Sequence, residues 1–203
     1  MTSLLADLSD KERRQLLDDL NYLNMSEIKK FCDNHSIPYT IWIQAPDGAL
    51  KKTPDRDRKG VILDRIRHYL LTGDVLKATI FPAEVVNLAK PSSKIGPSDR
   101  LYYGQYDKHS GKMTGILKQL TGGKFKNGAT ARIVAREFWS KGRAPTYEEF
   151  ASAWLHAVEN HKRPNPEWAF LSDLAEKGNS SGWKQKRIEI ARKVLRVLSA
   201  LEK

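Results

Sequence analysis

The spacing of apolar residues along the chain predicts a mainly helical fold. Ser9-Asp-Lys-Glu12 has the pattern of a capping box, in which Ser9 caps a helix and Glu12 reaches back to it. The helix that it opens runs to about Tyr22 and has an apolar face made of Leu16, Leu17, Leu20 and Leu23. The same period predicts further helices over residues 26–35, 59–71, 82–89, 129–139, 147–160, 166–177 and 183–201.

Residues with special backbone preferences set the ends of these helices. Ser26 can cap the second predicted helix, and Pro38 cannot continue it. Gly73 suits the left-handed position that follows the third. Thr146 and Glu149 form another capping box, and a few residues separate the helix that they open from the one before it. That pair of helices also fits a helix-turn-helix.

Two stretches are typical of β-hairpins. Thr40–Gln44 is rich in β-branched and aromatic residues, and Ala45-Pro-Asp-Gly48 carries Pro and Gly where a type I turn places them. Ala49–Thr53 can therefore pair back. A second hairpin is predicted over residues 99–115, with its turn at 107–111. The predicted fold class is mainly α with one or two small β-hairpins.

Residues 23–73 combine two of the predicted helices with the proline between them. The segments are Leu23-Asn-Met-Ser-Glu-Ile-Lys-Lys-Phe31, Ile37-Pro38 and Lys59-Gly-Val-Ile-Leu-Asp-Arg-Ile66. This pattern resembles the SAP domain, a small helix–extension–helix unit of chromatin and DNA-repair proteins. The resemblance implies a core made of Leu23, Ile28, Phe31, Ile37, Ile62 and Ile66. It also implies DNA binding, often with weak sequence preference, and Lys59 and Arg65 match the family's basic positions.

The connection inside this SAP-like unit is longer than that of the family. Residues 38–58 hold the first predicted hairpin, and Asp57 stands where the family usually has Gly. Pro91-Ser-Ser-Lys-Ile-Gly-Pro97 is the best candidate for a linker. We therefore expect an SAP-like helical domain with an inserted β-hairpin over residues 1–90 and a basic helical domain over residues 98–203.

The net charge of +11 is unevenly distributed along the chain. Residues 1–75 hold 12 Lys+Arg and 12 Asp+Glu, so residues 76–203 carry the whole excess. Within the latter, residues 90–143 hold 12 basic and 3 acidic residues. A positive field of this kind attracts phosphate and speeds encounters with nucleic acid. An ordinary basic surface is the alternative explanation.

Two groups of basic residues are the predicted DNA contacts. The first lies near the start of the third predicted helix, whose free amides suit a phosphate, and consists of Lys51, Lys52, Arg56, Arg58, Lys59 and Arg65. The second group lies in the glycine-rich loop at 122–128, in the helix after it and just beyond that helix. It consists of Lys124, Lys126, Arg132, Arg136, Lys141 and Arg143. That loop lacks P-loop spacing, which favours a backbone-phosphate contact over a nucleotide site. A self-paired surface loop, with Asp55 and Asp57 neutralising the arginines, is the alternative for the first group.

Tyrosines suggest a possible contact with bases. Tyr102, Tyr103 and Tyr106 lie in a segment rich in lysine. Aromatic rings in such a setting can stack on unpaired bases. The alternative is that they are the buried aromatic residues of the second predicted hairpin.

Little in the sequence indicates catalysis. Cys32 is the single cysteine, so an internal disulfide is ruled out, and its place in a helix favours a buried thiol. His156 and His161 are five residues apart and do not share a helix face as zinc ligands would. We predict no cofactor and no metal. The enzymatic alternative is a metal-dependent nuclease that uses Asp55 and Asp57.

The leading hypothesis is a non-catalytic protein that binds double-stranded DNA through phosphate contacts with weak sequence preference. RNA is the alternative polymer, and an acidic protein bound by an assembly subunit is the alternative partner. The apolar runs are too short to span a bilayer and no leader opens the chain, so no membrane partner is expected. We therefore expect a cytoplasmic protein that is associated with the nucleoid, or a nuclear protein if the source is a eukaryote. The sequence does not indicate whether the protein is a monomer or an oligomer.

Overall fold

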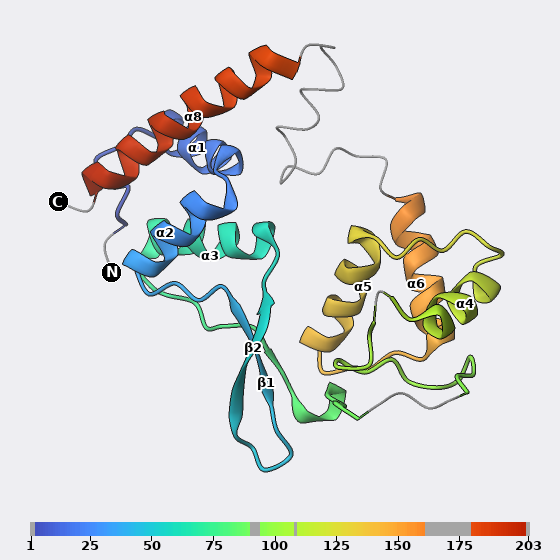
Figure 1. Ribbon diagram of the computed structural model, residues 1–203. Coiled ribbons are helices and arrows are strands. Elements are labelled where there is room, and N and C mark those ends of the chain that lie inside the picture. The colour runs from blue at the N-terminus through green and yellow to red at the C-terminus, as the bar shows by residue number, and fades with distance from the viewer. Residues whose placement is uncertain (1–2, 90–93, 108, 161–179, 202–203) are drawn as a thin grey trace. The chain divides into compact units, whose positions relative to one another are not determined.

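The computed structural model describes residues 3–89, 94–107, 109–160 and 180–201. They form a mainly helical fold with one small three-stranded sheet, which confirms the predicted fold class (Figure 1). The α-helices are α1 (Asp10–Asp19), α2 (Met25–Asn34), α3 (Lys59–Thr72), α4 (Gly111–Leu120), α5 (Ala129–Ser140), α6 (Tyr147–Glu159) and α8 (Ser180–Leu201). The 3-10 helices are η1 (Leu20–Tyr22) and η2 (Ala83–Val85), and the strands are β1 (Thr40–Gln44), β2 (Leu50–Arg56) and β3 (Ile80–Phe81).

The chain forms two compact units. The first unit comprises Met1–Thr40, Arg56–Ala78 and Pro164–Lys203, and the second comprises Ile41–Asp55 and Thr79–Arg163. These units do not coincide with the domains expected from the sequence, for two physical reasons. β1 pairs in parallel with β3, so the hairpin belongs with the residues that follow it. α8 buries its apolar side in the core of the first unit.

Helix caps in the first unit follow the sequence, with one correction. The capping box of Ser9 and Glu12 opens α1 as predicted. The predicted cap Ser26 is wrong, because Asn24 caps α2 two residues earlier. Its Oδ1 accepts hydrogen bonds of 2.9 Å from the amides of Ser26 and Glu27. Glu27 in turn accepts from the Asn24 amide at 2.7 Å, which completes a capping box with Asn in place of Ser or Thr.

The core of the first unit gathers the apolar faces of its helices. The residues that match the SAP core are all buried in it: Leu23, Ile28, Phe31, Ile37, Ile62 and Ile66. α8 lies along α1 and η1 (Figure 1) and adds Ala191, Val194 and Leu198 to this core. Gly73 ends α3 as predicted, with φ +78° and its amide donating to the Tyr69 carbonyl at 2.8 Å. Packing on α8 therefore completes the first unit.

The sheet of the second unit has the order β2–β1–β3. The first predicted hairpin is confirmed, because β1 and β2 are joined by a turn in which the Gly48 amide donates to the Ala45 carbonyl at 2.8 Å. β3 pairs on the other side of β1, with Trp42 opposite Ile80 and Ile43 opposite Phe81. The sheet thereby ties the hairpin to the helices that follow.

The second predicted hairpin is wrong. Residues 111–120 form α4, whose N-terminus is capped by Ser110 Oγ, which accepts from the Met113 amide at 3.2 Å. Two glycines in this stretch, Gly111 and Gly115, argue against a helix locally. The burial of Met113 and Leu117, four residues apart, overrides that preference.

The helix predicted over residues 82–89 is reduced to η2, after which Val86 forms an isolated bridge with Tyr103. The helix predicted over residues 166–177 lies outside the described residues, as does part of the predicted linker. The helices predicted over 129–139 and 147–160 are confirmed as α5 and α6.

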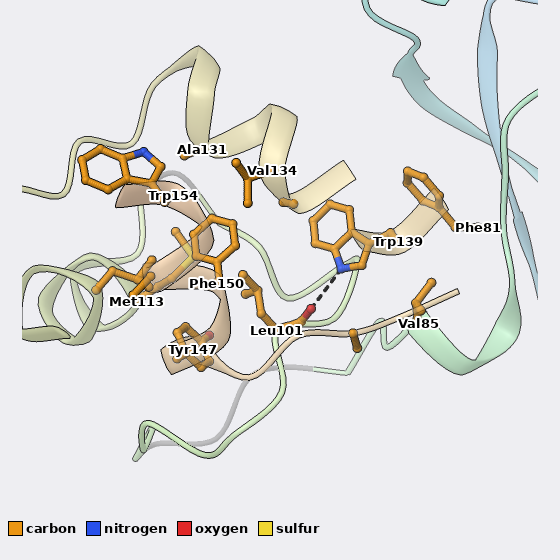
Figure 2. Close-up of a cluster of buried hydrophobic side chains, with 14 of the residues drawn as sticks. Phe81, Val85, Leu101, Met113, Ala131, Val134, Trp139, Tyr147, Phe150 and Trp154 are labelled. Atoms are coloured by element: carbon orange, nitrogen blue, oxygen red, sulfur yellow. Dashed lines mark hydrogen bonds between the residues drawn. The ribbon is translucent and has the colours of Figure 1, made fainter. Parts of the chain in front are cut away.

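The core of the second unit determines which side of α5 faces outward. Figure 2 shows the buried face of α5 directed into this core, with Ala131, Val134 and Trp139 among the side chains drawn. Trp139 is fixed by a hydrogen bond of 2.9 Å from its Nε1 to the Leu101 carbonyl. Ala131, Val134 and Ala135 are buried on this face, whereas Arg132 is exposed.

Candidate nucleic-acid interface

Six basic residues follow α5 from the loop before it to the loop after it. We call this set the α5 basic row: Lys124, Lys126, Arg132, Arg136, Lys141 and Arg143. Arg136 is half-buried and the other five are exposed. Arg132 and Arg136 are one helical turn apart, which places their Cα atoms about 6 Å apart along the helix axis. Of the second group of predicted contacts, Arg132 and Arg136 therefore lie on α5 itself, and the other four lie in the loops that flank it.

Carboxylates partly balance two members of the row. Arg136 Nη2 lies 3.3 Å from Asp55 Oδ1. Arg143 Nη2 lies 3.1 Å from Glu149 Oε1, and its guanidinium stands over the Phe138 ring at 4.7 Å. Within the described part of the chain, no ion pair involves Lys124, Lys126, Arg132 or Lys141. Most of the positive charge of the row is therefore directed to solvent.

The charge of α6 argues against a helix-turn-helix in which α6 is the reading helix. Its first turn carries Glu148 and Glu149, and Glu149 is committed to the capping box with Thr146. Acidic residues at the N-terminus of a helix repel the phosphates that border a DNA groove. The exposed cations of the basic row lie along α5 and its flanking loops rather than at the start of α6.

The first group of predicted contacts is divided between the two units. Lys51 and Lys52 lie exposed on β2 in the second unit, whereas Arg56, Arg58 and Lys59 belong to the first. Arg58 is the N-cap residue of α3. The Lys59 ammonium donates to the Asn21 carbonyl. Both Arg58 and Lys59 are half-buried.

Arg65 requires a correction. The resemblance places it at a basic position for DNA, but the residue is only 6% exposed. Its Nη1 donates to Asp57 Oδ2 at 2.6 Å and to the Pro38 carbonyl at 2.8 Å. Arg65 therefore joins α3 to the connection on either side of the hairpin, and its guanidinium is buried rather than exposed on the surface.

The two carboxylates of the nuclease alternative bind other side chains of the protein. Asp57 is buried against Arg65, and Asp55 holds Arg136 and the Tyr103 hydroxyl. Among the residues that the structure describes, no group of three or more His, Cys, Asp or Glu side chains is placed to hold a metal ion. Cys32 is buried as predicted, and burial raises the pKa of its thiol to about 12. The thiol is thus protonated at neutral pH.

A cleft of about 690 Å³ opens in the second unit beside the basic row. Arg132 and Arg136 line it together with Tyr103, Tyr106 and Trp139. The cleft, and the place of Trp139 in its lining, are not among the features predicted from the sequence. The signal was present, because Arg132, Arg136 and Trp139 recur at helical spacing along one edge of α5.

The tyrosines of the cleft are held by their hydroxyl groups. Tyr103 donates to Asp55 Oδ2 at 2.8 Å, and Tyr106 donates to Asn127 Oδ1 at 2.6 Å. Burial raises the pKa of both Tyr103 and Tyr106 to about 12. Both rings are therefore neutral at physiological pH and present no negative charge to a phosphate.

Comparison of the chain with protein-family models, with curated proteins and with solved structures gave no match. The resemblance of residues 23–73 to the SAP domain stays a prediction. In the described part of the chain, no helix has the length and apolar character needed to cross a membrane.

Proposed function

We propose that the protein binds nucleic acid, double-stranded DNA foremost, through phosphate contacts along the α5 basic row and without catalysis. The observation that carries the proposal is the gathering of six cations on one helix and its flanking loops. Exposed cations of this kind can contact the phosphates of a nucleic-acid backbone and require no particular base sequence.

The charge of the second unit supports this proposal. By sequence, its residues include 16 Lys+Arg and 9 Asp+Glu, a net charge of +7. The six residues of the basic row span only 20 positions, from Lys124 to Arg143, and Glu137 is the one acidic residue among them. This local excess gives the unit a directed positive field, which raises the rate and affinity of association with a polyanion.

The first unit would supply a second contact. Arg56, Arg58 and Lys59 precede or open α3, and the first turn of that helix holds no acidic residue. The side chain of the N-cap Arg58 does not cap α3, and the amides at the start of a helix suit an anion. The SAP resemblance supports the same surface. Such binding would place the protein in the cytoplasm at the nucleoid, or in a nucleus.

Salt dependence of binding to a labelled duplex tests the proposal. Six phosphate contacts are expected to give a log–log slope of about −5 against salt concentration. A duplex of RNA in the same assay distinguishes the two polymers. Binding that is equally tight at all salt concentrations would overturn the proposal.

Two further measurements distinguish the alternatives. Polyglutamate of matched charge is added as a competitor of the labelled duplex. If it competes as well as unlabelled duplex does, an acidic protein partner is favoured over nucleic acid. Cleavage of the duplex in Mg²⁺ or Mn²⁺ that is lost in both Asp55→Asn and Asp57→Asn would favour a nuclease. We expect weak competition and no cleavage.

A further inference from the structure

The cleft beside the basic row combines flat aromatic surface with positive charge. Tyr103 and Tyr106 each meet Trp139 edge to face, at 5.6 Å and 5.9 Å between ring centroids. These contacts hold the rings at a steep angle to the indole, and the hydroxyl bonds to Asp55 and Asn127 fix their orientation. The cleft therefore has rigid aromatic walls.

The charged groups of the cleft are arranged unevenly. Arg132 and Arg136 come from α5, and Arg132 is exposed. Of the two acidic residues in the lining, Asp55 is already bound to Arg136 and Tyr103. Asp107 accepts from the His109 amide at 2.8 Å. Both carboxylates accept hydrogen bonds from within the protein, and Arg132 is an exposed residue of the lining.

We propose that this cleft binds an unpaired nucleobase of a nucleic acid whose phosphates follow the α5 basic row. The inference rests on the proposed function and adds to it a preference for DNA that carries a single-stranded end or gap. The volume of about 690 Å³ exceeds that of a single base, and the row leads directly to the cleft through Arg132 and Arg136. Stacking on tyrosine needs no base-specific hydrogen bonds, so weak sequence preference is retained.

Three ligands with one common duplex test this proposal. The first is blunt, the second carries short 3′ and 5′ single-stranded tails, and the third carries the same tails with abasic nucleotides. Because the abasic tails keep the phosphates and lack the bases, the second and third ligands separate stacking from charge. We expect the second to bind about tenfold more tightly than the third.

Each outcome has a distinct meaning. Equal affinity for normal and abasic tails, with the blunt duplex still bound, would overturn the cleft proposal and leave the proposed function intact. Failure of all three ligands to bind would overturn the proposed function, and the cleft proposal with it.

Variants of Tyr106 locate the effect. Tyr106→Leu removes the ring and is expected to abolish the tenfold advantage of normal tails, with affinity for the blunt duplex within about twofold of the unmodified protein. Tyr106→Phe keeps the ring and is expected to keep the advantage. If Tyr106→Leu fails to fold, 2-aminopurine in the tail of the normal ligand decides: its fluorescence falls when the base stacks, and unchanged fluorescence on binding contradicts the proposal.

Discussion

Asp55 and Arg136, which are 81 residues apart in the sequence, form an ion pair of 3.3 Å between Oδ1 and Nη2. The second oxygen of Asp55 accepts from the Tyr103 hydroxyl at 2.8 Å. The end of β2 is therefore attached to α5, and the charge of one arginine of the basic row is partly neutralised.

Removal of the Asp55 charge is expected to strengthen DNA binding. Asp55→Asn keeps an acceptor for Tyr103 and releases the charge of Arg136, so affinity should rise by about threefold and the salt slope should steepen by up to about 0.9. Asp47→Asn in the hairpin turn makes the same change in net charge away from an arginine and should have a smaller effect. A loss of affinity in Asp55→Asn at every salt concentration would contradict this account.

Asp57 is expected to matter for stability. The Asp57 and Arg65 side chains are each 6% exposed, so Asp57→Ala leaves a buried guanidinium without its carboxylate. The loss in unfolding free energy should be about 3 kcal/mol or more, measured by urea denaturation. Asp64→Ala is the matched control, because the side chains of the Arg67–Asp64 pair are 27% and 73% exposed, and it should cost less than about 0.5 kcal/mol. A small cost for Asp57→Ala with a gain in DNA affinity would instead favour Arg65 as a DNA contact.

The second unit is expected to lose stability in alkali. Burial raises the pKa of Tyr103, Tyr106 and Tyr147 to about 12, from an ordinary value of 10.0. Between pH 10 and 12 the unfolded chain therefore releases protons that the folded chain retains, so stability falls as the pH rises through this range and is unaffected below it. Tyr147→Phe should reduce the fall, with little change at pH 7. Thermal unfolding at each pH measures the stability of both proteins. A loss of stability of the same size in Tyr147→Phe would contradict the raised pKa of Tyr147.

Gly104 shapes the rim of the cleft. Its φ is +92°, and a Cβ atom there would lie 2.6 Å from the Asn87 carbonyl oxygen and 2.7 Å from Leu88 Cδ2. Gly104→Ala should lower the unfolding free energy by about 2 kcal/mol. Gly115→Ala on α4 has nothing within 4 Å of the added atom and should be stabilising by up to about 1 kcal/mol. Equal effects of the two substitutions in urea denaturation would show that the turn at Gly104 is not constrained.

Local patterns predicted much of the fold and part of the site. Where a capping box and an apolar face agree, as at Ser9 and Thr146, the helix begins where the sequence places it. α4 was missed because Gly111 and Gly115 lower helix propensity locally, whereas the burial of its apolar side chains is a tertiary effect. The same distinction holds for the site. The residues of the basic row lie within 20 positions of the sequence, so local pattern finds them, but the pairing of Arg136 with Asp55 depends on long-range packing.

The α5 basic row can be tested most directly through the salt dependence of duplex binding. Replacing Lys124, Lys126 and Arg132 together by Ala should reduce the magnitude of the log–log slope by about 2.7, or about 0.9 for each phosphate contact. Replacing Lys112 and Lys118, which are exposed on α4 outside the row, should leave the slope nearly unchanged. A slope that is unchanged in the triple variant, or reduced in proportion to charge in both variants, would show that the row is an ordinary part of a basic surface.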